Sequence, residues 1–293
     1  MVHVLNIQYV HKNKTMIEKL NDLTHDCILE FNKEIKSFDF LLIADVHFDS
    51  VSCDRKLLKK HLDEVVERNA KVLIFGDFFD IMGGKFDKRS SKGDLRPEYN
   101  TSNYIDNVVD DAIDFLTPYK EYIMFISPGN HELSILRYHE TDVTKRLAKA
   151  LDAEVGTYGG WIRMRYSYEG EGSRGSYKIA YNHGYGGGGP VTKDVIQTSR
   201  KAVYLPDADI VISGHTHDRW IFPIARERFL LSGKIEQDEQ THLKLGSYKY
   251  SYSKGSSWER QMGHPPKSDP GIWLTIFMNG KRKTKRKFEL AEN

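Results

Sequence analysis

Four largely apolar runs constrain the fold of this chain more than any other feature. They occupy residues 38–45, 70–77, 122–130 and 207–215. A strand that is buried on both faces has no polar side, so each run predicts a strand inside a sheet. Between and after the first runs, apolar residues recur at helical spacing and predict helices over 54–69, 103–116 and 140–151. Such alternation of strands and helices is typical of a layered α/β fold.

The second half of the chain favours β-structure. Residues 161–184 predict an antiparallel hairpin around a glycine-rich turn. Other stretches that favour strands are 1–10, 25–32, 228–235, 241–253 and 272–290. We therefore expect two packed sheets flanked by helices, in a single domain over residues 1–293 with a β-rich C-terminal part from about 218 to 293.

The composition is that of an ordinary soluble globular protein. Of the 293 residues, 39% are hydrophobic and 29% are charged, and the net charge of +2 does not by itself indicate a nucleic-acid-binding protein. The two cysteines, Cys27 and Cys53, form no CxxC motif and are too few for a disulfide framework. No secretory signal and no stretch near the ~20 apolar residues of a membrane span is visible. We expect a soluble, cytoplasmic protein that binds no membrane.

Polar residues gather where the predicted strands end. In open α/β sheets, ligands bind at the carboxyl ends of the strands, so these side chains are candidates for a common site. They are Asp45 and His47, Asp77 and Asp80, Asn130 to Glu132, His183, and His215 and His217.

The chemistry of these side chains points to metal ions. Carboxylate, amide oxygen and imidazole form a mixed oxygen and nitrogen donor set, which suits Mn, Fe, Zn or Ni better than Ca. Seven ligands are too many for one tetrahedral ion. They suit two divalent metals that share a bridging carboxylate, roughly 3.5–4 Å apart, as in enzymes that hydrolyse phosphate esters. We expect Mn first among the possible metals.

Five ordered motifs carry a resemblance to a known family. The segments DVH, GDFFD, GNHE, NHG and GHTH follow one another between residues 45 and 217. In this order they resemble the calcineurin-like metallophosphoesterase family, in particular its dinuclear phosphodiesterase branch. The resemblance implies a four-layer α/β/β/α sandwich, with two mixed β-sheets flanked by helices, and a site for two metals.

The resemblance also implies a role for each motif residue. The first metal would be held by Asp45, His47, Asp77 and His217. The second would be held by Asp77, Asn130, His183 and His215, so that Asp77 bridges. His131 would face the scissile phosphate and stabilise charge or protonate the leaving oxygen, while Asp80 and Glu132 would orient the ligands. We expect His215 and His217 to share one side of an extended segment, with Gly214 allowing close backbone approach.

Substrate contacts are harder to assign. The loop 82–100 carries Lys85, Lys88, Arg89, Lys92 and Arg96, and Arg137 follows GNHE. Arg89, Arg96 and Arg137 are candidate phosphate contacts, although a merely solvated loop is an equal alternative. The basic segment 281–287 fits either an edge strand protected by lysines or a contact to a nucleic-acid backbone. We expect Asp49 to be a surface or capping residue that binds no metal, and the loops 82–100 and 184–200 to shape the substrate pocket.

Three functions fit these observations. The first is a metal-dependent phosphodiesterase that acts on a nucleic acid or a nucleotide by metal-activated hydroxide, and the second is a phosphomonoesterase acting on a nucleotide or protein. The third is a non-catalytic interaction module on the same fold. Retention of His131 and of all seven ligand positions favours an enzyme. The blocks ADVHFD and GDFFDIMGG differ from those of the protein phosphatases, which favours the phosphodiesterase. The oligomeric state is open.

Overall fold

The computed structural model describes residues 15–81, 95–189, 191–250, 266, 268–279 and 283–293. The strand expected over residues 1–10 and the candidate residue Arg89 lie outside this part of the chain. Within it, no helix combines the length and the apolar character that crossing a bilayer requires.

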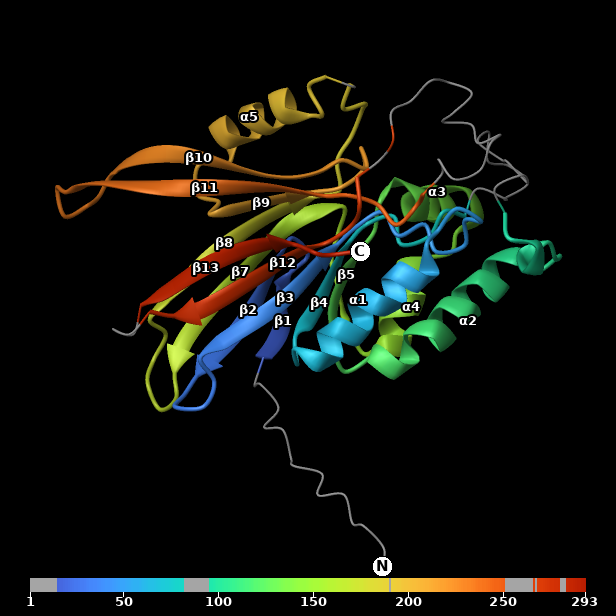
Figure 1. Cartoon of the computed structure of the whole chain (residues 1–293), viewed down its shortest axis with the longest axis horizontal. Coiled ribbons are helices and arrows are strands. Elements are labelled where there is room, and N and C mark those ends of the chain that lie inside the picture. The colour runs from blue at the N-terminus through green and yellow to red at the C-terminus, as the bar shows by residue number, and fades with distance from the viewer. Residues whose placement is uncertain (1–14, 82–94, 190, 251–265, 267, 280–282) are drawn as a thin grey trace, which may run out of the picture.

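Two mixed β-sheets pack face to face at the centre of the molecule (Figure 1). In order across the seven-stranded sheet lie β1 (Thr15–Asn21), β2 (Thr24–Phe31), β7 (Gly159–Tyr168), β8 (Gly175–Asn182), β9 (Ile210–Ser213), β11 (Ile235–Leu245) and β10 (Arg219–Phe229). The six-stranded sheet has the order β13 (Thr284–Leu290), β12 (Ile272–Met278), β3 (Ser37–Ile43), β4 (Lys71–Phe75), β5 (Ile123–Ser127) and β6 (Glu154–Val155).

Helices cover the outer faces of both sheets, which gives the four layers expected from the resemblance (Figure 1). On the six-stranded sheet lie α1 (Arg55–Glu67), α2 (Tyr104–Leu116), α3 (Asn130–His139) and α4 (Val143–Leu151), with short 3₁₀ turns at Pro97–Tyr99 and Thr117–Tyr119. On the seven-stranded sheet lies α5 (Val195–Tyr204). The helix α1 shows why these segments are helical: Asp54 caps its first amides, and Leu58, Leu62 and Val65 recur on one buried face.

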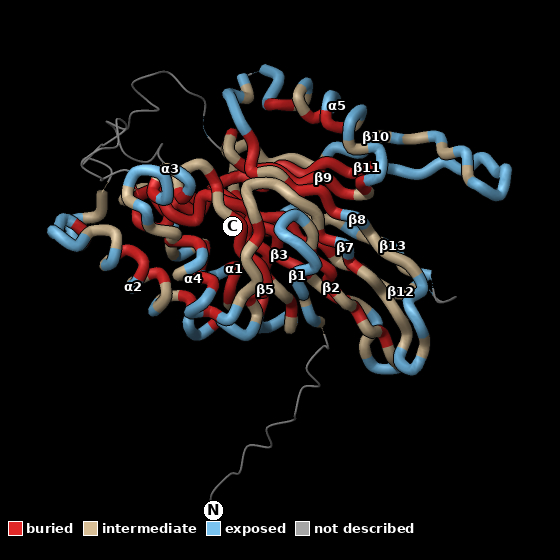
Figure 2. The backbone as a smooth tube through the Cα atoms, turned by 180° about the vertical axis from the view of Figure 1, so that it is seen from behind, coloured by how far each residue is buried: buried red, intermediate tan, exposed pale blue. Residues whose placement is uncertain are grey.

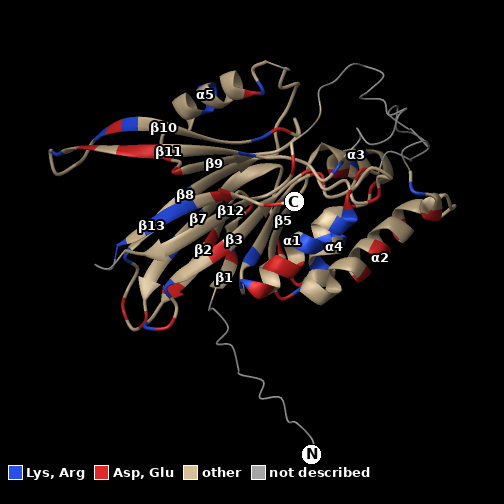
Figure 3. Ribbon diagram, viewed as in Figure 1, with Lys and Arg blue, Asp and Glu red and all other residues tan. Residues whose placement is uncertain are grey.

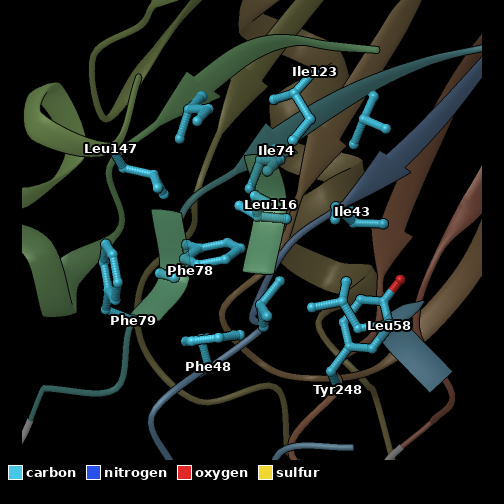
Figure 4. Packing of buried hydrophobic residues seen from close by; sticks show 14 of the residues in the cluster. Ile43, Phe48, Leu58, Ile74, Phe78, Phe79, Leu116, Ile123, Leu147 and Tyr248 are labelled. Atoms are coloured by element: carbon cyan, nitrogen blue, oxygen red, sulfur yellow. The ribbon is translucent and has the colours of Figure 1, made fainter. Parts of the chain in front are cut away.

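Strand β3 explains why the apolar runs are continuous. Phe40 and Leu42 pack in the cluster between the two sheets, whereas Leu41 and Ile43 pack in the cluster beneath the helices. Figure 4 shows Ile43 in this second cluster, with Ile74 from β4 and Leu116 from α2. Because successive side chains of a strand point to opposite faces, a strand between two cores needs an apolar residue at every position.

The strand directions bring the motif segments to one edge. Strands β3, β4 and β5 run parallel in one sheet, and β8 and β9 run parallel in the other. Hydrogen bonds then tie the segments that follow them together: the amide of Asp45 donates to Gly76 O at 3.0 Å, and the amide of Gly214 donates to His183 O at 2.9 Å. The carboxyl ends of five strands therefore converge.

Three expectations about secondary structure were incomplete or wrong. The helix α3 begins directly at Asn130 and was not predicted. The helix α5 begins at Val195, inside the segment 184–200 that was expected to be a loop. Residues 228–235 do not form one strand. Strand β10 ends at Phe229 and β11 begins at Ile235, so most of this segment is the turn between them. Figure 2 shows that the far end of this hairpin is exposed, and the apolar residues that suggested a strand there, Phe229, Leu231 and Ile235, are exposed and not packed in a core.

Candidate metal centre

The loops that carry the motif residues have an unusual backbone. Asp45, His47, Asp77, His215 and His217 all have a positive φ, between 49° and 72°. Residues other than glycine rarely adopt this left-handed conformation, and it concentrates at functional sites where the surrounding structure enforces it. The expectation that His215 and His217 lie on an extended segment is therefore wrong: β9 ends at Ser213, and both histidines are left-handed.

One group of side chains is formed by Asp45, His47 and His217, whose nearest ligand atoms all lie within 4.8 Å of one another. The Nε2 atoms of the two histidines are 3.1 Å apart. Oδ1 of Asp45 lies 3.5 Å from His217 Nε2 and 3.9 Å from His47 Nε2. Two ring nitrogens and a carboxylate oxygen thus converge on one point, as the ligands of a divalent metal do.

A second group is formed by Asp77, His183 and His215, again with ligand atoms within 4.8 Å. His183 Nε2 lies 3.0 Å from Asp77 Oδ2, and Oδ1 of Asn130 lies 2.8 Å from His215 Nδ1. His183 Nε2 is also 3.8 Å from Asp45 Oδ1, so the two groups are adjacent. The structure therefore brings together all seven residues predicted as metal ligands.

Two buried atoms support a fit to cations. Asp45 Oδ1 and His183 Nε2 are buried and have no hydrogen-bond partner in the described part of the chain. A buried polar atom without a partner is costly, and a bound cation would satisfy both atoms. The residues of the two groups therefore fit the divalent metals implied by the resemblance.

The charges at the site point the same way. Burial alone would lower the pKa of His183, but the carboxylates of Asp77 and Asp45 outweigh it and raise the pKa to about 10. Burial would raise the pKa of Asp77, yet the neighbouring charges of His183 and His131 hold it well below its ordinary value. The two carboxylates thus attract positive charge to one buried place.

Glycines allow the strand ends to approach so closely. Gly76 has a φ of +88°, and a Cβ at this position would lie 2.4 Å from His183 Nδ1. A Cβ at Gly214 would lie 2.4 Å from Asp45 Oδ2. Any side chain at either position would push a ligand residue out of place.

Glu132 ties two of the site loops together. Its buried carboxylate accepts hydrogen bonds from the amides of Gly129 (2.7 Å), Phe79 (2.8 Å) and Asp77 (3.1 Å). Burial, together with the charge of Asp77, raises the pKa of Glu132 to about 7. Glu132 therefore positions the backbone that carries Asp77 and Asn130, in agreement with the orienting role expected for it.

Asp80 and His131 lie beside the first group. Asp80 Oδ1 is 2.8 Å from His47 Nδ1, which leaves His47 Nε2 to face Asp45 and His217. His131 Nδ1 lies 2.5 Å from the carbonyl oxygen of Asp80, and its Nε2 lies 3.8 Å from Asp77 Oδ2. His131 is thus adjacent to the metal ligands, with one ring nitrogen held by the backbone and the other directed toward the site.

Three supporting residues escaped the sequence analysis. Asp49, expected to be a surface or capping residue, is buried and accepts hydrogen bonds from the amides of Asp80 and Ile81 and from the Tyr104 hydroxyl. Ser247 Oγ donates to Asp45 O at 2.8 Å, and Lys249 forms an ion pair with Asp80. Asp49 lies next to the motif DVH, whereas Ser247 and Lys249 lie in no motif, and only the folded chain reveals what these three residues contact.

The candidate substrate residues have different surroundings. Arg96 donates to the carbonyl oxygens of Ser50 (3.1 Å) and Cys53 (2.9 Å), so much of its guanidinium is already engaged by the backbone. Arg137 is exposed on α3, the helix that begins with Asn130 and His131.

The described part of the basic segment 281–287 belongs to β13, an edge strand of the six-stranded sheet (Figure 3). Lys285 and Lys287 are exposed, whereas Arg286 donates to the carbonyl oxygen of Glu239 on β11. This arrangement favours edge protection for the segment.

Comparison with known proteins places the chain in a family. A search of curated proteins gave no match. Among solved structures, similarity of fold extends to Vps29 from Chaetomium thermophilum (11% identity, TM-score 0.37, 86% of this chain and 96% of that chain). It extends also to a predicted phosphoesterase from Streptococcus pneumoniae (13%, 0.33, 86% and 88%) and to GAP50 of Plasmodium (12%, 0.41, 86% and 84%). The sequence model of the calcineurin-like phosphoesterases matches residues 38–219, which is more than half of the chain. This span contains every residue of the two ligand groups, and the chain belongs to the calcineurin-like phosphoesterase family.

Proposed function

We propose that the protein is a hydrolase that cleaves phosphodiesters with the help of two divalent metal ions. The observation that carries this proposal is the adjacency of the two ligand groups. Asp45 Oδ1 lies 3.5 Å from His217 Nε2 in the first group and 3.8 Å from His183 Nε2 in the second. Two sites this close would both contact one phosphate group.

The first ion would be held by Asp45, His47, Asp77 and His217, and the second by Asp77, Asn130, His183 and His215. When bound, the pair of ions would supply a nucleophile at neutral pH and neutralise the charge of the phosphoryl oxygens. Manganese is the metal that we propose first, and Fe, Zn and Ni suit the same oxygen and nitrogen donors.

His131 would act on the leaving group. Its Nδ1 is held by the carbonyl oxygen of Asp80, which fixes the ring and presents Nε2 to the site. Protonated at Nε2, it would donate a proton to the oxygen that departs from phosphorus. An alkoxide is a poor leaving group, so the cleavage of an ester that expels an alkoxide gains from such an acid.

The substrate class that we propose is a nucleic acid or a nucleotide. The exposed Arg137 lies on the helix that carries His131, and we propose it as a contact to a second phosphate. A phosphomonoesterase is the alternative enzyme. A non-catalytic module is disfavoured, because such a module has no need for His131 beside a complete set of ligands. The cytoplasmic location stays a prediction.

The test is hydrolysis by the metal-loaded protein of three substrates: a chromogenic diester, bis-p-nitrophenyl phosphate; the matching monoester; and end-labelled linear DNA, single- and double-stranded. We expect the diester to be cleaved with Mn²⁺ faster than the monoester. On DNA, whose leaving oxygen is an alkoxide, His131→Ala should lower kcat by about 10²–10⁴-fold while Mn²⁺ still binds, and on the nitrophenyl esters, whose leaving group needs no proton, the loss should be much smaller. Asp77→Asn should lower Mn²⁺ binding as well as kcat.

The results separate the alternatives. A preference for the monoester would replace the phosphodiesterase with the phosphomonoesterase. No hydrolysis of any substrate by a protein that binds two Mn²⁺ ions would favour the non-catalytic module. Cleavage of DNA in addition to the chromogenic diester would identify a nuclease, and its absence would point to a nucleotide or another compact diester.

A further inference from the structure

Lys249 lies in a segment that supports the metal centre from outside the span that defines the family. The segment follows β11, some thirty residues beyond the family match at 38–219. Ser247 Oγ and the amide of Tyr248 both donate to the carbonyl oxygen of Asp45, at 2.8 and 3.1 Å. The backbone of Lys249 forms an isolated antiparallel β-bridge with Cys53, and Lys249 is only 8% exposed. The C-terminal part of the chain therefore packs directly against the loop that carries a metal ligand.

The ammonium group of Lys249 meets the carboxylate of Asp80 symmetrically. Its Nζ atom lies 3.2 Å from each of the two carboxylate oxygens. Both side chains are buried, so water screens the attraction little and the geometry of the pair is well defined. Asp80 is held from its other side as well, because its amide donates to Asp49 Oδ1 at 2.6 Å.

Asp80 contacts two histidines of the site and so holds their rings in place. Its Oδ1 atom contacts His47 Nδ1 at 2.8 Å, and its carbonyl oxygen contacts His131 Nδ1 at 2.5 Å. The contact with His131 holds Nδ1 of that ring, so that its Nε2 faces the site, and the contact with His47 holds that ring against the Asp80 carboxylate. Asp80 thus governs the orientation of a predicted metal ligand and of the predicted acid.

Charge explains why a cation is needed at this place. Asp80 and Asp49 are two buried acidic residues joined by the hydrogen bond from the Asp80 amide to the Asp49 carboxylate. Asp45 and Asp77 lie on the far side of His47 and His131. Among the described residues, only histidines would offset the negative charge of Asp80 if Lys249 were removed, and other carboxylates lie close by. Asp80 would then turn away from Asp49 or draw a histidine out of the site.

We propose that Lys249 is a positioning residue of the metal centre, which fixes His47 and His131 by holding Asp80. The part that concerns His131 rests on the proposed function, whereas the part that concerns His47 requires only that the protein binds metal. Metal binding and hydrolysis are therefore measured separately.

The test compares Lys249→Met, Lys249→Arg and Asp80→Asn in the full chain. Methionine matches the length of lysine without its charge, and arginine restores the charge. The control is Lys244→Met. Lys244 forms an equally buried ion pair, 2.6 Å from Asp194, which involves none of the predicted ligands. Mn²⁺ affinity is measured by calorimetry on metal-free protein, and unfolding by circular dichroism shows which variants are folded.

We expect Lys249→Met to weaken binding of Mn²⁺ by about tenfold, and Asp80→Asn by about 10–100-fold. Lys249→Arg should recover most of the loss. In the Asp80→Asn background, the added Lys249→Met change should weaken binding by less than about twofold, because it acts through Asp80. Lys244→Met should lower the melting temperature but leave Mn²⁺ affinity unchanged. If the protein hydrolyses the diester, kcat of Lys249→Met should stay below that of the unmodified protein even at saturating Mn²⁺.

Three outcomes would overturn the proposal. One is unchanged Mn²⁺ affinity in folded Lys249→Met. Another is a full additional loss when Lys249→Met is combined with Asp80→Asn. The third is a loss in Lys244→Met equal to that in Lys249→Met, which would mean that any broken buried ion pair has the same effect. If Lys249→Met does not fold, failure of Lys249→Arg to bind Mn²⁺ better than Asp80→Asn does would refute the positioning role. Absence of hydrolysis in the unmodified protein would refute the proposed function and leave the binding comparison intact.

Discussion

Glu132→Ala should destabilise the metal-free protein, because backbone amides of the site lose their hydrogen-bond acceptor. The change removes the acceptor of three buried amide groups, those of Asp77, Phe79 and Gly129. Each buried amide left without an acceptor costs about 1–2 kcal/mol when water partly replaces the lost bond. The free energy of unfolding should therefore fall by about 3–6 kcal/mol at pH 5.

The loss should depend on pH. The pKa of Glu132 is raised from 4.5 to about 7 by burial and the charge of Asp77. A raised pKa contributes stability that is fully present below the unfolded-state value and is lost as the pH rises through the folded-state value. At pH 8 the folded protein bears the cost of a buried charge, up to about 3 kcal/mol, which alanine relieves. The loss caused by Glu132→Ala should thus be about 3 kcal/mol smaller at pH 8 than at pH 5.

The assay is urea unfolding in EDTA at both pH values, followed by circular dichroism. Glu132→Gln keeps one acceptor oxygen and cannot ionise. At pH 5 it should therefore lower the free energy of unfolding by less than Glu132→Ala does. Leu136→Ala, at an exposed position of the same helix, should change stability by no more than about 0.5 kcal/mol. A loss below about 1 kcal/mol at pH 5, or a loss that grows toward pH 8, would refute the reasoning.

Three further predictions concern other parts of the molecule. Gly76→Ala should lower the melting temperature well below that of Gly170→Ala, because both glycines have positive φ but only Gly76 has an atom of His183 2.4 Å from the added methyl; equal shifts would show that the close approach is unimportant. Mn²⁺ at a hundred times its dissociation constant should stabilise the protein by about 2.7 kcal/mol in a thermal melt, and Asp77→Asn should abolish most of this shift. Burial, aided by the charge of Lys244, lowers the pKa of Lys201 to about 8 from 10.5, so stability linked to this lysine is present above pH 10.5 and lost as the pH falls through 8. The stability of Lys201→Met relative to the unmodified protein should therefore be greater at pH 7 than at pH 10. Equal stability differences at both pH values would contradict this.

The buried strands and the candidate metal ligands could be read from the sequence. In strand β3, residues 40–43 had to be apolar at every position because they separate two cores, and such a run is typical of a buried strand. The motifs around Asp77 and His215 could be recognised because a metal centre needs particular donor atoms, and few side chains supply them. Helix α5 could not be predicted in this way, since it follows a glycine-rich segment and covers the sheet with polar as well as apolar groups, among them Thr198 and Lys201.

Only the tertiary structure determined what supports the ligands. Lys249 and Asp80 are 169 residues apart in the chain, and Ser247 is 202 residues from Asp45. A lysine in a tyrosine-rich stretch has no local signal that distinguishes it from a solvated one, and Asp49 looked like a surface residue for the same reason. Local patterns record which residues are apolar and which could bind a metal. The partner of a buried charge is decided by how distant strands pack, because desolvation makes that charge dependent on whichever group the fold brings beside it.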